Sequence, residues 1–523
     1  MAPDEPCVRL SGSPVGKAGV MVAEHPLPTP VAADPVAAAP IVVASNRGPV
    51  SYALREDGSL VAGRGGGGLV SGLSEIGRDP RGAAAVWVCA ALGEGDRLAA
   101  SRAGRRLDPA DTGGLRVRML DIPAGTFSAA YNGVANSVLW FAHHMLWQTP
   151  LEPVFDKEFR SQWADYETYN TAFADAIAEE AAEGAVVLVQ DYHLTLVPAL
   201  LRARRPDLRV GHFSHTPWAP PDYYRLLPDD IAEQVLRGVL GGDRAAFLTR
   251  RWAEAFAACC ADVLGAEVVR EEHGGAAAVR FAGRTTLLGV HALGADADFL
   301  RERAHRPDVE ERLTALREQI GPGRRTILRV DRTELSKNIV RGLHAYRRLL
   351  EDHPHWRGRV THLAFAYPSR QDLAVYRDYT AEVKRVADAV NAEFGTADWQ
   401  PVILHVKDDF ARSLAAYRMA DVALVNPIRD GMNLVAKEVP AVSDHGCVLV
   451  LSREAGAAAE LAGEAIVVNP YDVEATARAL HVALLMDPAE RAERAERLAT
   501  AATRLPPARW FTEQLHALEG DAT

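Results

Sequence analysis

The stretch VALVNPIRDGMNLVAKE, residues 422–438, joins a short apolar run to a polar turn and then to an amphipathic segment. Its pattern predicts a buried strand over residues 422–426 and a helix that begins at Gly431. The free N–H groups of a helix start and the positive end of the helix dipole favour a diphosphate. An ordinary capped helix would have the same spacing, so the stretch alone leaves both interpretations open.

Two carboxylates flank the start of this predicted helix. Asp430 could cap it or accept hydrogen bonds from sugar hydroxyls. Glu438 lies two turns along the helix and could reach a ribose diol, although a solvated glutamate would give the same sequence.

The strand-then-helix pattern extends in both directions from this stretch. Strands are expected over residues 41–45, 85–90, 185–190, 210–214 and 245–248, and again over residues 326–330, 360–365, 402–405, 422–426 and 448–452. Helices are expected over residues 163–183, 229–240, 337–351, 369–391 and 431–443. This alternation predicts an α/β protein with two facing Rossmann-like, doubly wound domains. Because ligands bind beyond the carboxyl ends of such strands, the active site is expected in the interdomain cleft.

The chain of 523 residues divides into four expected parts. Residues 1–39 are rich in Ala, Pro and Val and are expected to form a disordered extension. The two domains are expected over residues 40–292 and 293–505, with a boundary near residues 289–296. Residues 506–523 are expected to form a C-terminal helix that could pack back on the first domain.

Composition excludes several classes of function. The net charge of −11 argues against a broad nucleic-acid or anionic-membrane surface. The sequence contains no run of about eighteen apolar residues, so no membrane-spanning helix is expected. The five cysteines have no CxxC spacing, so neither a disulfide framework nor a zinc site is expected. With no signal-peptide pattern at the start, the sequence favours a cytoplasmic protein.

Polar residues follow several of the other predicted strands. Arg332 and Lys337 bracket a loop after one strand, where two cations can neutralise a departing diphosphate. Asp191 and His215 occupy the same position after two earlier strands. Singly, each of these side chains is more often solvated or structural, but their shared position at strand ends favours a cleft site.

A glycine-rich run, RGGGGL at residues 64–69, follows the first predicted strand after a short loop. Its backbone could approach a phosphate closely, and a flexible surface loop is the plain alternative. The GxGxxG dinucleotide pattern is not met in the strand-to-helix position, which disfavours a nicotinamide-dependent oxidoreductase.

Taken together, these segments resemble the trehalose-6-phosphate synthase family, retaining glycosyltransferases with the two-domain GT-B fold. The resemblance is collinear from about residue 41 to residue 472 and covers most of the expected folded chain. The matching segments are Ser45-Asn46-Arg47, Gly67-Gly68-Leu69, Tyr131-Asn132 through Trp140, Asp191-Tyr192-His193-Leu194, His215-Thr216-Pro217, Arg332 with Lys337, Ser369-Arg370, Arg429 through Glu438, and Asn469-Pro470-Tyr471-Asp472.

The resemblance implies roles for the residues at the matching positions. The implied catalytic residues are His215, Arg332, Lys337 and Asp430. The implied donor-binding residues are Gly67, Gly68, Arg332, Lys337, Gly431, Met432, Asn433, Leu434, Val435 and Glu438. The implied acceptor-binding residues are Arg47, Tyr131, Trp140, Asp191 and Arg370.

The implied reaction moves glucose from UDP- or GDP-glucose to glucose 6-phosphate, with retention and without a metal or other cofactor. The expected partners are therefore these small molecules, with no nucleic acid and no membrane, and a homo-oligomer is possible because the family often forms dimers or tetramers.

Two departures of this sequence from the family pattern keep alternatives open. The family usually has an aromatic residue where this chain has Ala90, which leaves room for glycerol 3-phosphate or a cyclitol phosphate as acceptor. Residues 404–409, where the nucleobase should lie, have little family similarity, so UDP- and GDP-glucose stay open. A non-catalytic sugar-phosphate sensor is the less favoured alternative, because the residues expected for catalysis are all present.

Overall fold

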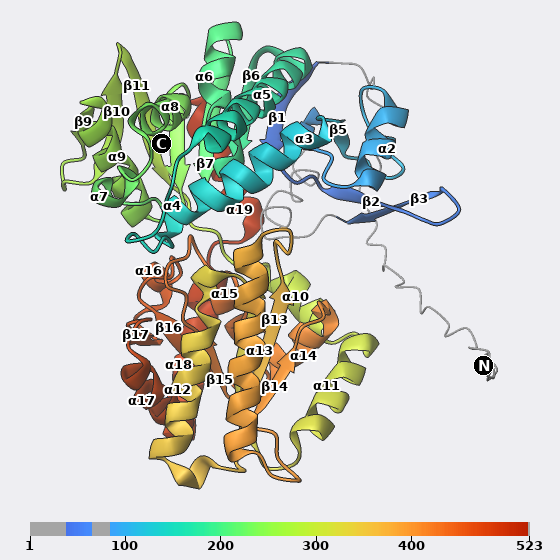
Figure 1. The fold of residues 1–523 in the computed structure, drawn as a ribbon, viewed down its shortest axis with the longest axis vertical. Coiled ribbons are helices and arrows are strands. Elements are labelled where there is room, and N and C mark those ends of the chain that lie inside the picture. Colours follow the sequence, from blue (N-terminus) through green and yellow to red (C-terminus); the bar gives the residue numbers. More distant parts are fainter. Residues whose placement is uncertain (1–37, 65–83, 521–523) are drawn as a thin grey trace, which may run out of the picture.

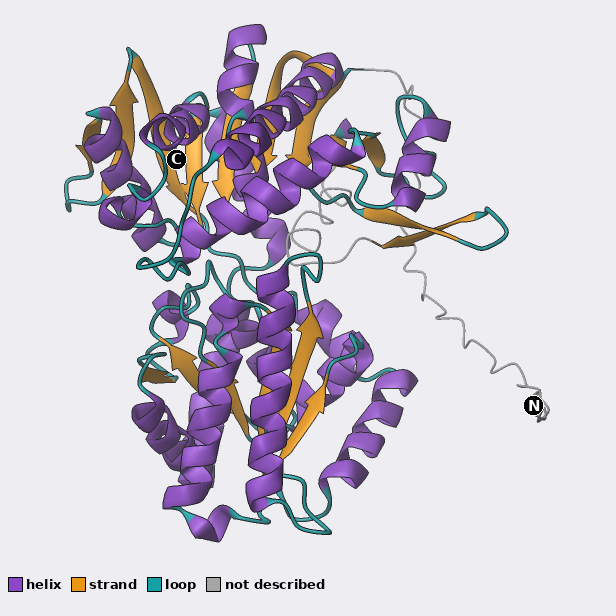
Figure 2. Ribbon diagram, in the orientation of Figure 1, coloured by secondary structure: helices purple, strands orange, loops and turns teal. Residues whose placement is uncertain are grey.

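Two large β-sheets covered by helices form the computed structural model, which describes residues 38–64 and 84–520 (Figure 1). The expected disordered extension over residues 1–39 therefore lies almost wholly outside the described residues. The predicted α/β class with two doubly wound domains is confirmed, because both sheets are mainly parallel and carry helices on both faces (Figures 1 and 2).

The first sheet has the strand order β5-β4-β1-β6-β7-β8-β11-β10-β9. Neighbouring strands from β5 to β11 pair in parallel, while β10 pairs antiparallel with both β11 and β9. Its strands are β1 Ala39–Ser45, β4 Val86–Ala90, β5 Arg116–Leu120, β6 Ala181–Gln190, β7 Arg209–Ser214, β8 Arg244–Phe247, β9 Glu267–Arg270, β10 Ala276–Phe281 and β11 Arg284–Val290.

The second sheet is parallel throughout, in the order β14-β13-β12-β15-β16-β17. Every residue of β15 and β16 is buried, which fits their continuous apolar sequences VALV and VLVLS. The strands are β12 Arg325–Thr333, β13 Val360–Pro368, β14 Val402–His405, β15 Val422–Val425, β16 Val448–Ser452 and β17 Ile466–Val468.

Helices cover both sheets. Those within the first half of the chain are α2 Glu94–Ala103, α3 Ala124–Ser128, α4 Trp140–His144, α5 Lys157–Glu180, α6 Val197–Arg204, α7 Pro221–Tyr224, α8 Asp229–Leu240 and α9 Arg250–Leu264, with a π-helical segment at Ala129–Leu139. Those that follow are α10 Ala297–Ala304, α11 Pro307–Ile320, α12 Ile339–Asp352, α13 Ala374–Phe394, α14 Phe410–Met419, α15 Val435–Val442, α16 Ala458–Leu461, α17 Val473–Leu485, α18 Pro488–Thr503 and α19 Pro507–Glu519.

The carboxyl ends of the two sheets face each other. In Figure 2 the arrowheads of the central strands of the upper sheet point down and that of β13 points up, toward the junction of the two halves. Loops that follow the strands of both sheets therefore meet at this junction, where an α/β protein binds its ligands.

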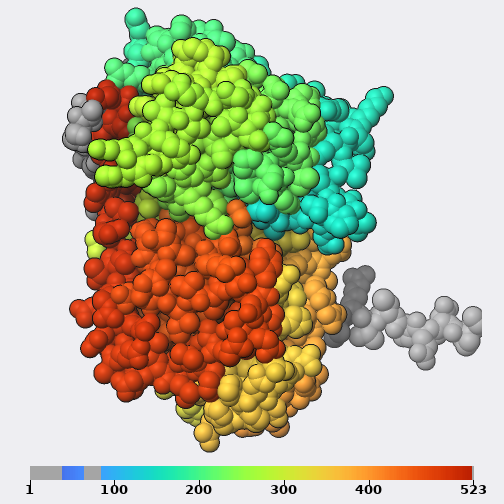
Figure 3. All heavy atoms as spheres, turned by 90° about the vertical axis from the view of Figure 1, so that its left-hand side faces the viewer, coloured from blue at the N-terminus to red at the C-terminus, as the bar shows by residue number. Residues whose placement is uncertain are grey.

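The C-terminal helix α19 leaves the second half of the molecule and lies on the first sheet. It contacts β6 and β7, and Trp510 packs edge-on against Phe213 of β7 with ring centroids 4.9 Å apart. Arg209 at the start of β7 also donates to the carbonyl of Glu519 at 2.8 Å. In Figure 3 the red end of the chain accordingly rises from the lower half along the side of the upper half.

One feature at the centre of the sequence prediction is wrong. The helix expected from Gly431 begins four residues later, because Asn433 adopts a left-handed conformation with φ of 73° and interrupts the helical path. Asp430 consequently does not cap the helix, and it is the Oδ1 atom of Asn433 that accepts the N–H of Ala436 at 3.3 Å.

A hairpin also separates the glycine run from the central sheet. β2 Val50–Leu54 and β3 Leu60–Arg64 pair antiparallel, so the run follows a hairpin strand rather than β1. The partial exposure of β2 and β3, unlike the continuous burial of the parallel strands, gives a weaker sequence signal.

Candidate active site

A lysine–aspartate pair joins the loops after two neighbouring strands of the second sheet. Lys337 follows β12 and Asp430 follows β15, and their Nζ and Oδ2 atoms lie 2.5 Å apart. Asn433 Nδ2 donates to the same Oδ2 atom at 3.1 Å. Burial opposes the charge of Lys337, yet Asp430 and other nearby carboxylates raise its pKa above the usual value. The lysine is therefore a fixed cation at the junction of the two halves.

A buried carboxylate accompanies two arginines in the same region. Glu334 lies between Arg332 and Lys337 in the sequence, and its side chain has 0% exposure. Its Oε1 atom is 3.3 Å from Arg332 Nη2 and accepts the hydroxyl of Ser369 at 3.0 Å. Burial would raise the pKa of this carboxyl, but the surrounding cations outweigh it and lower the pKa to about 2. The group is thus ionised at any ordinary pH.

Arg370 connects this group of charged residues to the first half of the molecule. Its guanidinium lies 4.0 Å from the ring centre of Trp140 and donates to the hydroxyls of Tyr376 at 2.7 Å and Tyr192 at 3.3 Å. Trp140 and Tyr192 belong to the first half, whereas Arg370 follows β13. An arginine stacked on an aromatic ring keeps its in-plane N–H groups available for an anion.

Two further predicted residues follow β6 and β7 of the first sheet. Asp191 Oδ1 accepts the backbone N–H of His215 at 3.2 Å, and His215 Nε2 donates to the side-chain oxygen of Gln190 at 2.9 Å. Burial lowers the pKa of His215 to about 3, so its imidazole is neutral. Burial also raises the pKa of Asp191 to about 7.

Gly431 brings the two halves into direct contact. A Cβ atom at this position would lie 1.9 Å from the carbonyl oxygen of His215, so no larger residue fits without a backbone shift. The indole N–H of Trp252, from the first half, donates to the carbonyl of Gly431 at 3.1 Å. Loops after β7 and β15 are therefore locked together at one point.

The remaining predicted donor residues line the start of α15. Met432 and Asn433 are buried, while Leu434 and Val435 are partly exposed. Glu438 accepts the hydroxyl of Tyr417 at 3.1 Å, and burial raises its pKa. Gly67 and Gly68 lie outside the described residues.

The remaining predicted acceptor residues are Tyr131 and Arg47. Tyr131 stacks on His193 with ring centroids 5.6 Å apart, and His193 in turn lies beside Tyr192. The positive charge of Arg47 lowers the pKa of His193, after the larger effects of burial and Arg370, although Arg47 itself is exposed. Ala90 has 1% exposure and belongs to the hydrophobic core of the first half, so its methyl group packs inside the protein.

Sequence reasoning missed three contributors to this region, namely Glu334, Tyr192 and Tyr376. Glu334 and Tyr192 lie inside segments already singled out, so a search for every polar side chain in those loops would have found them. Tyr376 lies on α13 and reaches Arg370 only through the fold.

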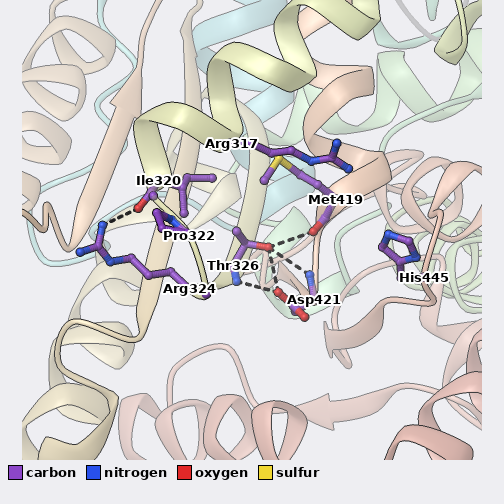
Figure 4. A pocket seen from close by; sticks show the side chains of 10 residues that line it. Arg317, Ile320, Pro322, Arg324, Thr326, Met419, Asp421 and His445 are labelled. Carbon is purple, nitrogen blue, oxygen red and sulfur yellow. Dashed lines mark hydrogen bonds between the residues drawn. The ribbon is translucent and has the colours of Figure 1, made fainter.

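A surface pocket of about 370 Å³ lies elsewhere, at the amino ends of β12, β15 and β16 (Figure 4). Its lining includes Arg317, Arg324, Thr326, Asp421 and His445. The pocket is therefore at the edge of the second sheet opposite to the residues described above. Within residues 38–64 and 84–520, no group of three or more His, Cys, Asp or Glu side chains is arranged to hold a metal ion, and no helix is long and apolar enough to cross a bilayer.

The chain is similar over most of its length to known glycosyltransferases. The profile described as Glycosyltransferase family 20 matches residues 40–520. An Aspergillus fumigatus alpha,alpha-trehalose-phosphate synthase [UDP-forming] is 34% identical over 90% of this chain and 95% of its own length. A Mycobacterium trehalose-6-phosphate synthase is 34% identical over 91% of this chain and 95% of its own length.

Solved structures agree with these relatives. The Escherichia coli enzyme bound with UDP-2-fluoro glucose has 26% identity and a TM-score of 0.78 over 92% of this chain and 99% of that one. A UDP-forming synthase from Burkholderia vietnamiensis has 28% identity and a TM-score of 0.77 over the same shares. The two facing Rossmann-like domains are thus of the GT-B type. With this fold and the match over residues 40–520, the chain belongs to glycosyltransferase family 20, the family of the trehalose-6-phosphate synthases that it resembles.

Proposed function

We propose that the protein transfers glucose from a nucleoside diphosphate glucose to glucose 6-phosphate, with retention, to give α,α-trehalose 6-phosphate. The observation that carries the proposal is the meeting of two cationic groups at one interdomain junction. Lys337 pairs with Asp430 within the second half, and Arg370, also from the second half, stacks on Trp140 of the first half. A reaction that joins two phosphate-bearing substrates needs two such groups close to each other.

The donor is proposed to bind along the loops of the second sheet. Arg332 and Lys337 would neutralise the diphosphate, together with backbone N–H groups at Leu434 and Val435 near the start of α15. Glu438 would accept hydrogen bonds from the ribose, and Asp430, His215 and residues 431–433 would orient the glucose. Because relatives are named UDP-forming, UDP-glucose is the proposed donor and GDP-glucose its competitor in the test.

The acceptor is proposed to bind where the halves meet. Arg370 would take the phosphate of glucose 6-phosphate, helped by Arg47 and Tyr131. Trp140 would pack against the sugar ring, and Asp191 would accept a sugar hydroxyl. The stacking of Arg370 on Trp140 supports this role, because the aromatic face fixes the guanidinium plane that a phosphate would meet.

In the proposed step, the bond between the glucose C1 atom and the diphosphate oxygen breaks while an acceptor hydroxyl oxygen bonds to C1 from the same face. The departing phosphate oxygen takes the proton of that hydroxyl, so atoms and charge balance. Positive charge develops on the sugar and negative charge on the diphosphate. The fixed cation Lys337 would stabilise the latter, and the neutral His215 would avoid repelling the former.

No divalent metal is proposed, because Arg332 and Lys337 supply positive charge for the diphosphate. EDTA should therefore change the initial rate by less than about twofold. A complete loss of rate that Mg²⁺ restores would contradict this part of the proposal. Homo-oligomer formation and a cytoplasmic location stay predictions.

The deciding experiment incubates the purified enzyme with UDP-glucose or GDP-glucose and one acceptor at a time. Glucose 6-phosphate, glycerol 3-phosphate and a cyclitol phosphate are the acceptors, and free glucose is the control that lacks the phosphate. Mass spectrometry identifies the products, and NMR coupling at C1 reports the anomeric configuration. The proposal expects α,α-trehalose 6-phosphate from glucose 6-phosphate. Consumption of no donor, or product only with another acceptor, would overturn it.

A variant tests the diphosphate role separately. Arg332→Ala should abolish turnover while Tm stays close to that of the wild type, because the Arg332 side chain is 57% exposed and contributes little packing. A near-normal rate would contradict the role proposed for Arg332.

A further inference from the structure

Glu334 is the only acidic side chain that lies within 4 Å of both Arg332 and Arg370 among the described residues. Its Oε1 atom is 3.3 Å from Arg332 Nη2 and 3.9 Å from Arg370 Nη1. These arginines are the ones proposed above for the donor diphosphate and the acceptor phosphate. One buried carboxylate is thus shared between the two substrate subsites.

We infer that Glu334 is a positioning residue that holds Arg332 and Arg370 in place for the two phosphate-bearing substrates. The inference rests on the proposed function, since it assigns Glu334 to the same reaction.

The bonding of Glu334 differs from that of a carboxylate that only stabilises the fold. Glu180 is equally buried, and its Oε1 atom accepts from Arg105 Nε at 2.7 Å while its Oε2 atom accepts from Arg106 Nε at 2.9 Å. Among the described residues, the Glu334 side chain accepts one hydrogen bond, from Ser369, and its buried Oε2 atom has no partner. A buried ionised oxygen without a partner costs free energy, so a purely stabilising role explains Glu334 poorly.

The loose contacts leave the arginines free to bind anions. At 3.3 and 3.9 Å, the nitrogens of Arg332 and Arg370 are beyond the usual 2.7–2.9 Å of a charge-assisted hydrogen bond. The charge of Glu334 attracts their N–H groups, but these groups do not donate short hydrogen bonds to it. A phosphate oxygen could therefore take the tight bonds.

The backbone around Arg370 shows why such a hold is needed. Arg370 has a φ of 50°, a left-handed conformation that is costly for a long side chain and persists only when its surroundings fix it. The hydrogen bond from Ser369, the preceding residue, to Glu334 ties this strained loop after β13 to the loop after β12. Glu334 thus fixes both the charge and the backbone of the acceptor arginine.

The sign of the expected effect separates positioning from binding. Glu334→Gln keeps the shape of the side chain but removes one negative charge beside two cations. The local potential becomes more positive, so phosphate-bearing substrates should bind no more weakly. However, the guanidinium groups of Arg332 and Arg370 lose the negative charge that orients them. They should therefore stabilise the transition state less well. The variant should therefore lose kcat without a rise in KM.

The test measures kcat, both KM values and Tm for the full-length enzyme with UDP-glucose and glucose 6-phosphate. Glu334→Gln is expected to lower kcat about tenfold or more, with each KM within about threefold of wild type. Ser369→Ala, which removes the single hydrogen bond but not the charge, should lower kcat about threefold. The matched control Glu180→Gln should lower Tm and leave kcat within about twofold, because Glu180 lies in the first domain and touches none of the proposed site residues.

Each result decides the inference. Wild-type kcat in Glu334→Gln, or an unchanged kcat with raised KM values, overturns it. If Glu334→Gln does not fold, Ser369→Ala decides: a lowered kcat at unchanged KM supports positioning, and a wild-type kcat overturns it. A wild-type enzyme that forms no trehalose 6-phosphate would be a failure of the proposed function instead, and the wild-type assay, run first, reveals it.

Discussion

Two aspartates lie at opposite ends of β15 and serve different purposes. Asp421, just before the strand, accepts the backbone N–H of Thr326 at 2.9 Å and lies 3.1 Å from Arg325 and 3.4 Å from Arg491. Asp430, beyond the other end, pairs with Lys337 at the interdomain junction. The amino edge of this sheet thus holds together the elements of one domain, while the carboxyl edge presents charges to the other domain. Similar residues acquire different functions from the end of the strand at which they lie.

The sharpest test of this comparison removes the cation of the carboxyl edge. Lys337→Met should lower kcat about a thousandfold, because a fixed positive charge no longer stabilises the departing diphosphate. Tm should also fall, because the variant leaves the largely buried Asp430 carboxylate without its counter-charge. Steady-state rates and a thermal melt of the same preparation measure both. A rate within tenfold of wild type would contradict the idea that the carboxyl edge of the sheet serves the reaction while the amino edge stabilises the domain.

The interdomain contact gives the second largest expected effect. Gly431→Ala would place a Cβ atom 1.9 Å from the carbonyl oxygen of His215, so the loops must move apart. Because misplacement of about 1 Å can cost about a hundredfold in rate, kcat should fall by roughly ten- to a hundredfold. Gly463→Ala is the control, since a Cβ atom there meets nothing within 4 Å. Equal rates for the two variants would show that this close contact is dispensable.

Asp191 extends the comparison to the first sheet. Burial raises its pKa from 3.8 to about 7, so the folded state holds this proton more tightly than the unfolded chain does. The protonated Asp191 therefore contributes to the free energy of unfolding. This contribution is complete below a pH of about 4 and is lost as the pH rises through about 7. Asp191→Asn never ionises, so its Tm relative to wild type should increase between pH 5 and pH 8. Differential scanning fluorimetry across this pH range measures the Tm of both proteins. A constant difference in Tm between them would contradict the raised pKa of Asp191.

The smallest expected effect on activity is at the amino edge. Asp421→Asn weakens contacts to Arg325 and Arg491 and should reduce the free energy of unfolding by about 1–2 kcal/mol. For a domain of this size, that loss lowers Tm by a few degrees. The value of kcat should stay within twofold of wild type, because Asp421 lies at the opposite end of the strand from Lys337 and Asp430. A large loss of kcat without a change in Tm would show that the amino edge also serves the reaction.

Most of the parallel strands could be predicted from the sequence, because strands buried on both faces are continuous apolar runs. The expected strands over residues 402–405 and 448–452 match β14 and β16 in full. The antiparallel hairpins of β2 with β3 and of β9 with β10 were not expected, since partly exposed strands have a weaker pattern. Helix starts were less certain, because the left-handed conformations of Asn338 and Asn433 are not visible as breaks in an apolar pattern.

The sequence also predicted which loops would carry polar groups, but not how those groups pair. Strand order makes Lys337 and Asp430 neighbours although 93 residues separate them in the chain. Packing between the halves, which no local pattern encodes, puts Arg370 over Trp140. Glu334 was overlooked although it lies between two predicted residues, because its importance comes from burial and a missing partner rather than from spacing.

The return of α19 to the first sheet has a mechanical consequence. Within residues 84–520 the chain passes between the two halves twice, once after β11 and once before α19. These passages lie side by side, because a Cβ atom at Gly294 would be 2.1 Å from the carbonyl oxygen of Leu505. Two adjacent tethers restrict twisting more than a single one does, while they still permit bending about the line through them. Any relative movement of the two halves is thereby restricted to bending about the line through these two passages.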